Sequence, residues 1–448
     1  MFRRNRIFSG LPGVNAKVLT FDPVADHEAR RRELTAHGLL GPAVDLLNIY
    51  DHYRGHPWPK FTPARRPLRE LHALRRSEQA RVDGTLWRVS YRLPRRGGRV
   101  FEYVRDDGSA YLRVPDVDLH STSEAARRVA LIAPDGSWQS IPLVAWYNRW
   151  VQELAETEPT FVLTDARQFA PLMQRPPGHD HYRVHMLHNA HTRPPGRWDA
   201  PLTPGNQRLL AAVDRFDALV VATRRQRADI SRLRGGDKLY VVPNTVDAAQ
   251  VLPEVSRDPH RVVMLARLVR QKGLRRAIAV FVRVVREVPE AHLDIYGEGK
   301  LRRRLERDIA HRGLQDSITL RGYDRDARAA LWTCSALLLT SRFEAHPLAV
   351  SEAMARACPV VAFDIPYGPS EQLTDGKEGF VVPEGDVDTM ANRLVALLRS
   401  PDLVARMGEA GRATAGSDQS DRLVSGWAEV IHGVMAARSA EEGVDDAS

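Results

Sequence analysis

Two glutamates eight positions apart carry the first chemical signal in this 448-residue chain. Glu344 and Glu352 lie in the segment SRFEAHPLAVSEAMA, which follows an apolar run at 336–340 and passes into an amphipathic helical pattern. In doubly wound sheets, ligands bind where strands end and helices begin, because free backbone N–H groups there attract anions. Two carboxylates beside such a site can grip the hydroxyls of a sugar nucleotide. The alternative is that Glu344 is only a turn residue and Glu352 only a solvated charge on a helix face.

A second predicted loop of the same kind carries two cations. Arg267 and Lys272 follow a predicted strand at 261–266, and Gly273 lets the backbone approach a ligand closely. This combination suits a diphosphate, whose charge must be stabilised as it leaves. The alternative is an arginine-rich loop that only faces solvent.

A third predicted loop holds the tripeptide Gly297-Glu298-Gly299 after a predicted strand at 292–296. A single G-x-G is weak evidence for nucleotide binding. It gains weight here because parallel strands bring all three loops to one edge of a sheet.

Alternating short strands and helical patterns explain that shared edge. The predicted parallel strands are 161–164, 182–187, 218–223, 239–243, 261–266, 292–296, 317–321, 336–340 and 359–362. This rhythm predicts an α/β protein with two Rossmann-like domains, at 1–238 and 239–415. A helix at 416–437 should follow, and then a disordered acidic tail at 438–448.

The N-terminal third breaks the rhythm. Short strands are predicted at 86–93, 100–104, 111–114 and 128–133, with turn residues rich in glycine and aspartate between them. They predict an antiparallel β-meander inserted at about 84–140. Residues 48–54 are interpreted as a connection and 142–154 as a helix.

Composition excludes several classes of protein. The net charge of +9 comes from arginine clusters spread over the whole length, whereas a nucleic-acid binder would concentrate them. We therefore expect no nucleic-acid partner. No apolar run is long enough to span a membrane, no secretory signal is visible, and there are only two cysteines. These features predict a cytoplasmic protein, and contact with the inner face of the membrane stays open.

Metal chemistry has little support in the sequence. Three Asp-x-Asp tripeptides occur, starting at Asp116, Asp324 and Asp386, but none follows a strand in a setting that would hold a metal. We interpret all three as loops or helix caps.

The three loops together resemble retaining GT-B glycosyltransferases of the family 4 type, which include glycogen synthases, sucrose synthases and mannosyltransferases. The pattern R-x4-K-G, then G-x-G, then E-x7-E covers roughly 237–407. The segments FDIPYGPSE from Phe363 and DGKEGFVV from Asp375 are similar to the poly(glycerol-phosphate) and wall-teichoic-acid α-glycosyltransferase subgroup. The resemblance implies two domains facing a cleft, the first on the acceptor side and the second for the nucleotide-sugar donor.

The resemblance also assigns catalytic roles. Glu344 would hydrogen-bond the hydroxyls of the donor sugar, and Arg267 and Lys272 would stabilise the departing diphosphate. His188, in the segment LHNAH, would lie close to the reacting sugar, whereas His191 is interpreted as structural.

The same resemblance assigns the donor-binding residues. Glu352 would bind the ribose of the nucleotide. Gly297 and Gly299 of the glycine loop would also contact the donor. Backbone amides around His346, Pro347 and Leu348 would bind its phosphates, although Pro347 has no N–H to donate.

Two departures from the family are visible. Ala345 stands where the family usually has glycine. The usual first strand and its glycine-rich loop have no counterpart, and 18–20 corresponds to the usual second strand. We therefore expect either a sequence truncated at its N-terminus or a protein that lacks part of the cleft.

The predicted function is transfer of a hexose with retention of configuration. The donor would be UDP-glucose or UDP-N-acetylglucosamine, and the acceptor a glycan, a polyol-phosphate or a lipid-linked sugar. No metal and no cofactor are expected, and the β-rich insert would support a homo-oligomer. The alternative is a non-catalytic GT-B-like partner or scaffold subunit.

Overall fold

The computed structural model describes most of the chain: residues 2–41, 43–56, 64, 71, 74, 76–93, 98–116, 128–155, 159–165, 181–194, 196–247, 255–416 and 419–445. Parts of the predicted β-meander (94–97 and 117–127, including Asp118) and the end of the predicted tail lie outside these residues. The chain forms two compact units, Met1–Val162 with Gln168–Tyr182, and Leu163–Arg167 with Arg183–Ser448.

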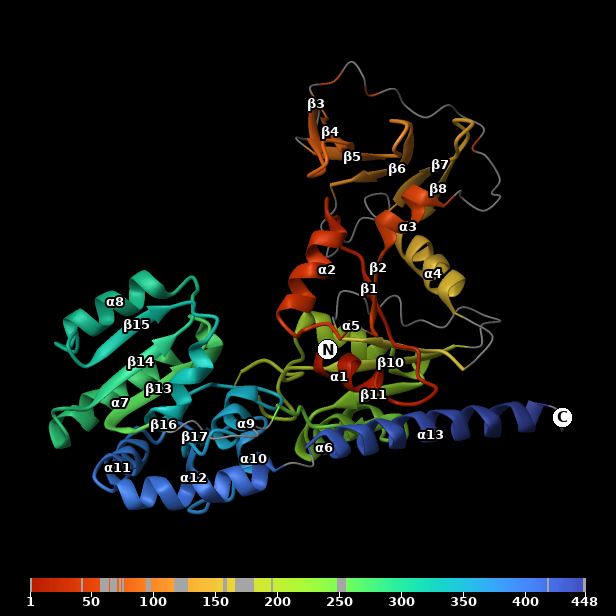
Figure 1. The fold of residues 1–448 in the computed structure, drawn as a ribbon. Coiled ribbons are helices and arrows are strands. Elements are labelled where there is room, and N and C mark those ends of the chain that lie inside the picture. The colour runs from red at the N-terminus through yellow and green to blue at the C-terminus, as the bar shows by residue number, and fades with distance from the viewer. Residues whose placement is uncertain are drawn as a thin grey trace. The chain divides into compact units, whose positions relative to one another are not determined.

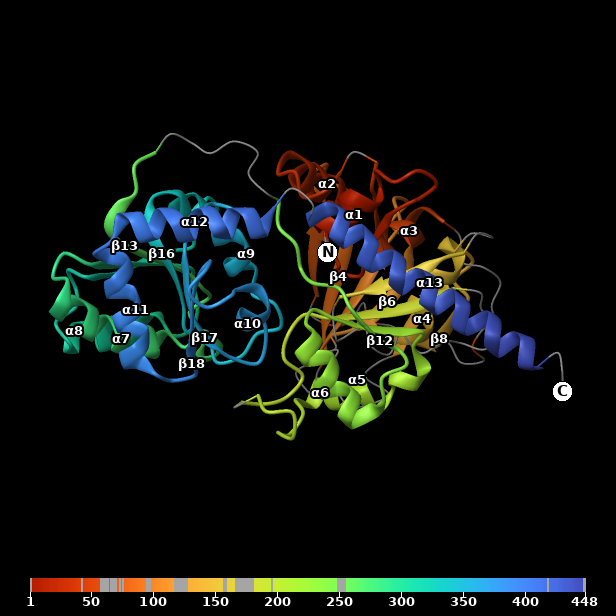
Figure 2. The same ribbon diagram turned by 90° about the horizontal axis from the view of Figure 1, so that it is seen from below.

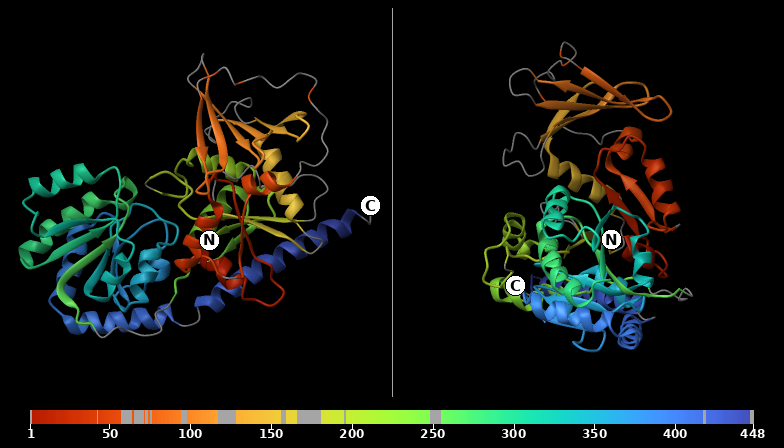
Figure 3. Two further views of the ribbon diagram at one scale, coloured as in Figure 1. Left: turned by 45° about the horizontal axis from the view of Figure 1, so that its top comes forward. Right: turned by 90° about the vertical axis from the view of Figure 1, so that its left-hand side faces the viewer.

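An antiparallel sheet dominates the first unit (orange to yellow in Figures 1 and 3). Its six strands follow chain order. They are β3 (Arg76–Ala80), β4 (Leu86–Arg92), β5 (Arg99–Val104), β6 (Ala110–Pro115), β7 (Arg128–Ile132) and β8 (Trp138–Pro142). Buried residues alternate with partly buried ones along β4, which places one face over a core. There Trp87 and Tyr103 pack with Trp146 and Trp150 of α4 (Leu143–Leu154).

The first residues of the chain form a smaller parallel pair. Strands β1 (Lys17–Thr20) and β2 (Asp45–Asn48) form a parallel pair; α1 (Phe2–Phe8) precedes them in the sequence, and α2 (His27–Ala36) lies between them. The predicted connection at 48–54 is wrong, because this segment forms α3 (Ile49–Gly55). Asn48 caps that helix by accepting hydrogen bonds from the N–H groups of Tyr50 and Asp51.

A four-stranded sheet has the order β12-β11-β10-β9. Its strands are β9 (Phe161–Thr164), β10 (Tyr182–Leu187), β11 (Ala218–Val221) and β12 (Leu239–Val241), and α5 (Pro204–Ala211) and α6 (Arg224–Arg234) connect them. Because β12 pairs with β11, it belongs to this sheet, whereas the predicted boundary at 238/239 would place it in the second domain.

A six-stranded parallel sheet follows, with the order β15-β14-β13-β16-β17-β18. Its strands are β13 (Asp258–Leu265), β14 (His292–Tyr296), β15 (Ile318–Gly322), β16 (Cys334–Leu339), β17 (Val360–Asp364) and β18 (Gly379–Pro383). Its helices are α7 (Leu274–Glu287), α8 (Arg302–His311), α9 (Leu348–Met354), α10 (Pro369–Gln372), α11 (Val387–Leu398) and α12 (Pro401–Ala415).

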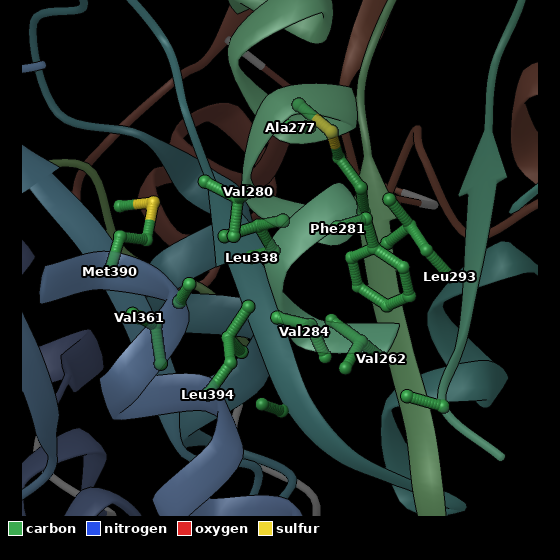
Figure 4. Close-up of a cluster of buried hydrophobic side chains, with 14 of the residues drawn as sticks. Val262, Ala277, Val280, Phe281, Val284, Leu293, Leu338, Val361, Met390 and Leu394 are labelled. Carbon is green, nitrogen blue, oxygen red and sulfur yellow. The ribbon is translucent and has the colours of Figure 1, made fainter. Parts of the chain in front are cut away.

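Apolar side chains of α7 and α11 seal one face of this sheet. Phe281 and Val284 of α7 and Leu394 of α11 pack over Val262 and Leu338 of the central strands (Figure 4). All five are almost fully buried, so the two central strands are fixed in register and the loops leaving them share one edge.

Two long helices end the chain, α12 and then α13 (Gln419–Asp445), as Figure 2 shows. Gly426 of α13 approaches the side chain of Val242, which follows β12, and Gly433 approaches that of Tyr240 in β12. Helix α13 continues through Asp445, so residues 438–445 are helical and not the predicted disordered tail. Among the described residues no helix is long and apolar enough to cross a membrane.

Candidate functional site

The carboxylate of Glu344 accepts hydrogen bonds from three side chains at the edge of the six-stranded sheet. Lys272 Nζ donates to its Oε1 at 2.6 Å, and Ser341 Oγ donates to the same oxygen at 2.8 Å. Gln271 Nε2 donates to Oε2 at 3.3 Å. Glu344 is only 8% exposed, so this charge is held in a partly desolvated pair with Lys272. The structure thus brings together two residues that are 72 positions apart.

The backbone on both sides of this carboxylate is fixed by the next loop of the sheet. The N–H of Glu344 donates to the carbonyl of Pro366 at 3.0 Å, and the N–H of Tyr367 donates to the carbonyl of Glu344 at 3.1 Å. The loop leaving β16 is therefore bound to the loop leaving β17. Such support keeps a binding carboxylate in one orientation.

Gly273 lets the cationic loop approach the end of β16. Its φ is +64°, and a Cβ placed there would lie 1.9 Å from the carbonyl oxygen of Thr340. Only glycine fits both conditions. This close approach places Lys272 against Glu344.

Replacing Gly273 by alanine should therefore destabilise the fold strongly. The left-handed backbone alone costs a side chain about 1–2 kcal/mol, and the clash with Thr340 should add about 1–3 kcal/mol. Gly385 is a matched control, because its φ is +87° and nothing lies within 4 Å of the position that a Cβ would take there. Urea unfolding of both alanine variants isolates the clash. Equal losses of stability would mean that the close approach is relaxed at no cost.

Gly297 and Gly299 pack against the same cationic loop. A Cβ at Gly297 would lie 2.2 Å from the carbonyl oxygen of Ala266, and one at Gly299 would lie 2.6 Å from that of Leu268. Their glycine identity is thus required by the packing of two loops. Binding of the donor by these glycines stays a prediction.

Arg267 lies on this loop with its side chain exposed. Within the part of the chain that the structure describes, its guanidinium makes no hydrogen bond or ion pair. A charged group in this condition is available to an anionic ligand, in contrast to Lys272, which is already paired.

Glu352 lies apart from the hydrogen bonds around Glu344. It is in α9, and its Oε1 accepts a hydrogen bond from Arg328 Nε at 2.5 Å. Arg328 belongs to a 3-10 segment, Ala327–Trp332, which the sequence did not mark as functional. A ribose hydroxyl that binds Glu352 would therefore hydrogen-bond a carboxylate that already accepts from Arg328.

The predicted phosphate cradle precedes α9. Pro347 caps the helix with φ −63°, and Leu348 is exposed at its first position. Burial lowers the pKa of His346 to about 4, and its Nδ1 has no hydrogen-bond partner among the described residues. Its carbonyl accepts a hydrogen bond from Asn244 Nδ2 at 3.2 Å.

The two histidines after β10 lie in different environments. His188 is partly exposed, and its Nε2 lies 2.8 Å from Asp165 Oδ1. His191 is fully buried with its ring stacked on that of Tyr367, at 5.9 Å between centroids and 10° between planes. Its packing agrees with the structural role expected for it, whereas His188 presents a ring whose orientation a carboxylate fixes.

Burial lowers the pKa of His191 from 6.5 to about 4, against a smaller opposing effect of Asp229. The unfolded chain therefore binds this proton first as the pH falls. The stability due to neutral His191 is complete above about pH 6.5 and is lost by about 1.4 kcal/mol per pH unit toward pH 4. We expect urea unfolding at pH 7, 6 and 5 to show this loss in the wild type relative to His191→Phe. Parallel pH profiles would contradict the assignment.

The Asp-x-Asp tripeptides behave as turns and caps where they are described. Asp386 caps α11 by accepting from the N–H of Thr389 at 3.0 Å, and Asp324 accepts from the N–H of Asp326 at 2.8 Å. No group of three or more histidine, cysteine, aspartate or glutamate side chains among the described residues is arranged to hold a metal ion.

Solved structures identify the fold. A mutant of S. aureus TarM, in complex with fondaparinux, alpha-GlcNAc-glycerol and UDP, is similar over 96% of this chain and 95% of its own, with a TM-score of 0.73 and 18% identity. The fold is GT-B, as the sequence predicts.

Sequence comparisons identify the domain that carries the site. Residues 253–414 match the family model "Glycosyl transferases group 1", so the chain contains a glycosyltransferase group 1 domain and the resemblance is confirmed. The match covers Lys272, Glu344 and Glu352.

Two curated relatives match over part of their length. Poly(glycerol-phosphate) alpha-glucosyltransferase of Bacillus subtilis is 26% identical over 230 residues, 51% of this chain and 34% of that protein. Poly(ribitol-phosphate) alpha-N-acetylglucosaminyltransferase of Staphylococcus aureus is 28% identical over 204 residues, 46% of this chain and 41% of that protein. The chain thus matches only about a third to two fifths of the length of these relatives.

Proposed function

We propose that this chain is a retaining glycosyltransferase that moves glucose or N-acetylglucosamine from a UDP-sugar to a polyol-phosphate acceptor. The observation that carries the proposal is the buried pairing of Glu344 with Lys272 at the strand ends of a glycosyltransferase group 1 domain. The names of the two curated relatives support the sugar and the acceptor. UDP is the nucleotide in the TarM complex, which supports the choice of base.

The geometry suggests how the residues divide the work. A sugar hydroxyl can donate to the free lone pairs of the Glu344 carboxylate, which Lys272 and Ser341 already hold in place. Lys272 and exposed Arg267 can then balance the charge that develops on the diphosphate as the bond to the anomeric carbon breaks. The departing phosphate oxygen takes the proton of the acceptor hydroxyl, which attacks from the same face, so the configuration is retained.

The donor assay tests this proposal against the non-catalytic alternative. We expect wild-type protein to release UDP from UDP-glucose or UDP-N-acetylglucosamine, faster when poly(glycerol phosphate) is present. Glu384, which forms an ion pair with Arg276 in the same domain, provides the matched control variant Glu384→Gln. UDP binding without release of any sugar would favour a partner or scaffold subunit and would overturn the proposal.

A basic surface beside His188 favours an anionic acceptor. Helix α6 exposes a series of arginines: Arg224, Arg225, Arg227, Arg232 and Arg234. The Arg232 guanidinium lies 5.4 Å from the ring centroid of Trp198, which is 41% exposed, and its Nη1 lies 3.5 Å from Asp229 Oδ1. Gln226 Nε2 of the same helix donates to the carbonyl of Asn189, next to His188, at 2.9 Å. A cation and an exposed aromatic ring together suit a chain of alternating phosphates and polyols.

Charge reversal on α6 should therefore weaken acceptor binding. We expect Arg232→Glu to reduce the affinity for poly(glycerol phosphate) by about tenfold, the effect of a lost charge-assisted contact. Arg304→Glu, on exposed α8, is the control and should change the affinity by less than about twofold. Equal effects of both variants in a titration at fixed salt would show that only net charge matters.

A further inference from the structure

A nine-residue segment that leaves β17 holds the backbone of Glu344. We call residues 364–372 the strap; they include the last residue of β17 and all of α10. The carbonyl of Pro366 accepts from the N–H of Glu344, and the N–H of Tyr367 donates back to its carbonyl, at 3.0 and 3.1 Å. The strap therefore fixes the peptide on each side of the carboxylate.

The same tyrosine reaches α6, which connects β11 and β12 of the four-stranded sheet. Tyr367 Oη donates to Asp229 Oδ2 at 2.8 Å, and its ring lies parallel to that of His191. Tyr367 is fully buried and Asp229 nearly so. Burial, followed by the hydrogen bond to Asp229, raises the pKa of Tyr367, so the hydroxyl keeps its proton and can donate. A hydrogen bond from a buried hydroxyl to a carboxylate is of the strong, charge-assisted kind.

A second contact joins the strap to α6. The two carboxylate oxygens of Glu371 accept from the N–H groups of Arg224 and Arg225, at 2.8 and 3.0 Å. These N–H groups belong to the first turn of α6, where helical partners are missing and the dipole favours negative charge. Glu371 therefore acts as a capping carboxylate supplied by a distant segment.

Tyr367 joins the backbone of Glu344 to α6, beside the contacts that Glu371 and Asp364 of the strap make with the same helix. The path runs from the Glu344 backbone to the Tyr367 backbone, along its buried ring and through its hydroxyl to Asp229. His188 lies on the loop whose Asn189 carbonyl accepts from Gln226 of the same helix. The donor-side carboxylate and the histidine loop therefore share α6 as a common support.

We infer that Tyr367 is a positioning residue that fixes the backbone of Glu344 relative to α6. Docking of the strap on α6 would then determine the position of the sugar-binding carboxylate. The inference rests on the proposed function for its effect on catalysis. Its structural part, the tie between Glu344 and α6, stands independently of any reaction.

Tyr367→Phe tests the tie because it removes only the hydroxyl. Tyr240→Phe is the control, since it deletes a tyrosine hydroxyl on β12, away from the strap. We expect amide hydrogen exchange at Glu344 and Tyr367, measured without substrate, to become about tenfold faster in Tyr367→Phe and to stay unchanged in Tyr240→Phe. Glu371→Ala should speed exchange at the strap as well, and Glu371→Gln should restore part of the protection, because the amide oxygen can still accept.

Kinetics then test the catalytic consequence. We expect kcat for sugar transfer to fall by about tenfold in Tyr367→Phe, with the affinity for UDP alone within about twofold of wild type. Unchanged exchange at Glu344 would overturn the inference, even if kcat fell, because the hydroxyl would then not act through the backbone of Glu344. Faster exchange with unchanged kcat would overturn the positioning role. If wild-type protein transfers no sugar, the proposed function fails, while the exchange result still decides on the tie.

Discussion

Glu344→Gln should lower the rate of sugar transfer by about 10²-fold or more, while UDP binding persists. The substitution keeps the shape of the side chain but removes the charge, so a sugar hydroxyl loses a charge-assisted hydrogen bond that strengthens as the transition state forms. It also leaves Lys272 facing a neutral amide instead of a carboxylate at 2.6 Å. Release of UDP from the donor, measured with UDP affinity by calorimetry, separates the chemical step from binding.

The control for this prediction is a carboxylate of the same domain outside the site. Glu384→Gln breaks an ion pair with Arg276 in which each side chain is 28% exposed, and it should leave the rate unchanged. A Glu344→Gln variant that keeps wild-type turnover would remove the residue from the catalytic group. A variant that instead loses UDP affinity would place Glu344 at the nucleotide and not at the sugar.

Lys272→Met should be the second severe substitution, with kcat lower by about 10²–10³-fold, the usual effect of removing one preorganised donor to developing charge. Lys272→Arg should restore part of the rate, since the charge returns with a different geometry. The variant should also lose stability. Removing one partner of a mostly buried ion pair leaves the other charge uncompensated, at a cost of about 3–5 kcal/mol when burial is complete and less here, because Lys272 keeps some exposure.

The double variant Lys272→Met/Glu344→Gln distinguishes the two effects. We expect it to recover most of the lost stability in urea unfolding, because no unpaired charge remains, and to remain as inactive as the worse single variant. Recovery of activity together with stability would mean that Lys272 serves only the fold. Losses of stability that add in the double variant would contradict the pairing of the two side chains.

The parallel architecture is predictable because buried parallel strands leave continuous apolar runs in the sequence. The predicted strands at 182–187 and 292–296 coincide with β10 and β14. Strand β3 escapes prediction because its sequence, RSEQA, is largely polar. Strand β8 escapes prediction because its sequence, WQSIP, mixes polar and apolar residues without alternation and ends in a proline. The end strand β18 contains part of the DGKEGFVV motif but is not predicted as a strand, because a glycine opens it and a proline ends it.

The candidate site is predictable to the level of loops. Sheet topology brings the three predicted loops to one edge, so Lys272 and Glu344 meet although no local spacing relates them. Gln271 and Ser341, which complete the carboxylate's partners, escape prediction because a neutral polar side chain beside a motif carries no distinctive pattern. The bond between Tyr367 and Asp229 joins positions 138 apart and follows only from the folded chain.

Some predictions keep that status. Binding of the ribose by Glu352 stays a prediction. A ribose hydroxyl would share the Glu352 carboxylate with Arg328, which already donates a hydrogen bond to it. Self-association through the antiparallel sheet is likewise a prediction.

The central claim is that the chain transfers a hexose with retention and uses Glu344 to do so. Its most direct test is proton NMR of the product formed from UDP-glucose, and separately from UDP-N-acetylglucosamine, with poly(glycerol phosphate) as the acceptor. UDP-sugars of this kind carry an α-linked sugar, so we expect a new α-anomeric signal on the polymer that is absent with Glu344→Ala. A β-anomeric product, no transfer from either donor, or an unchanged product with Glu344→Ala would contradict the account.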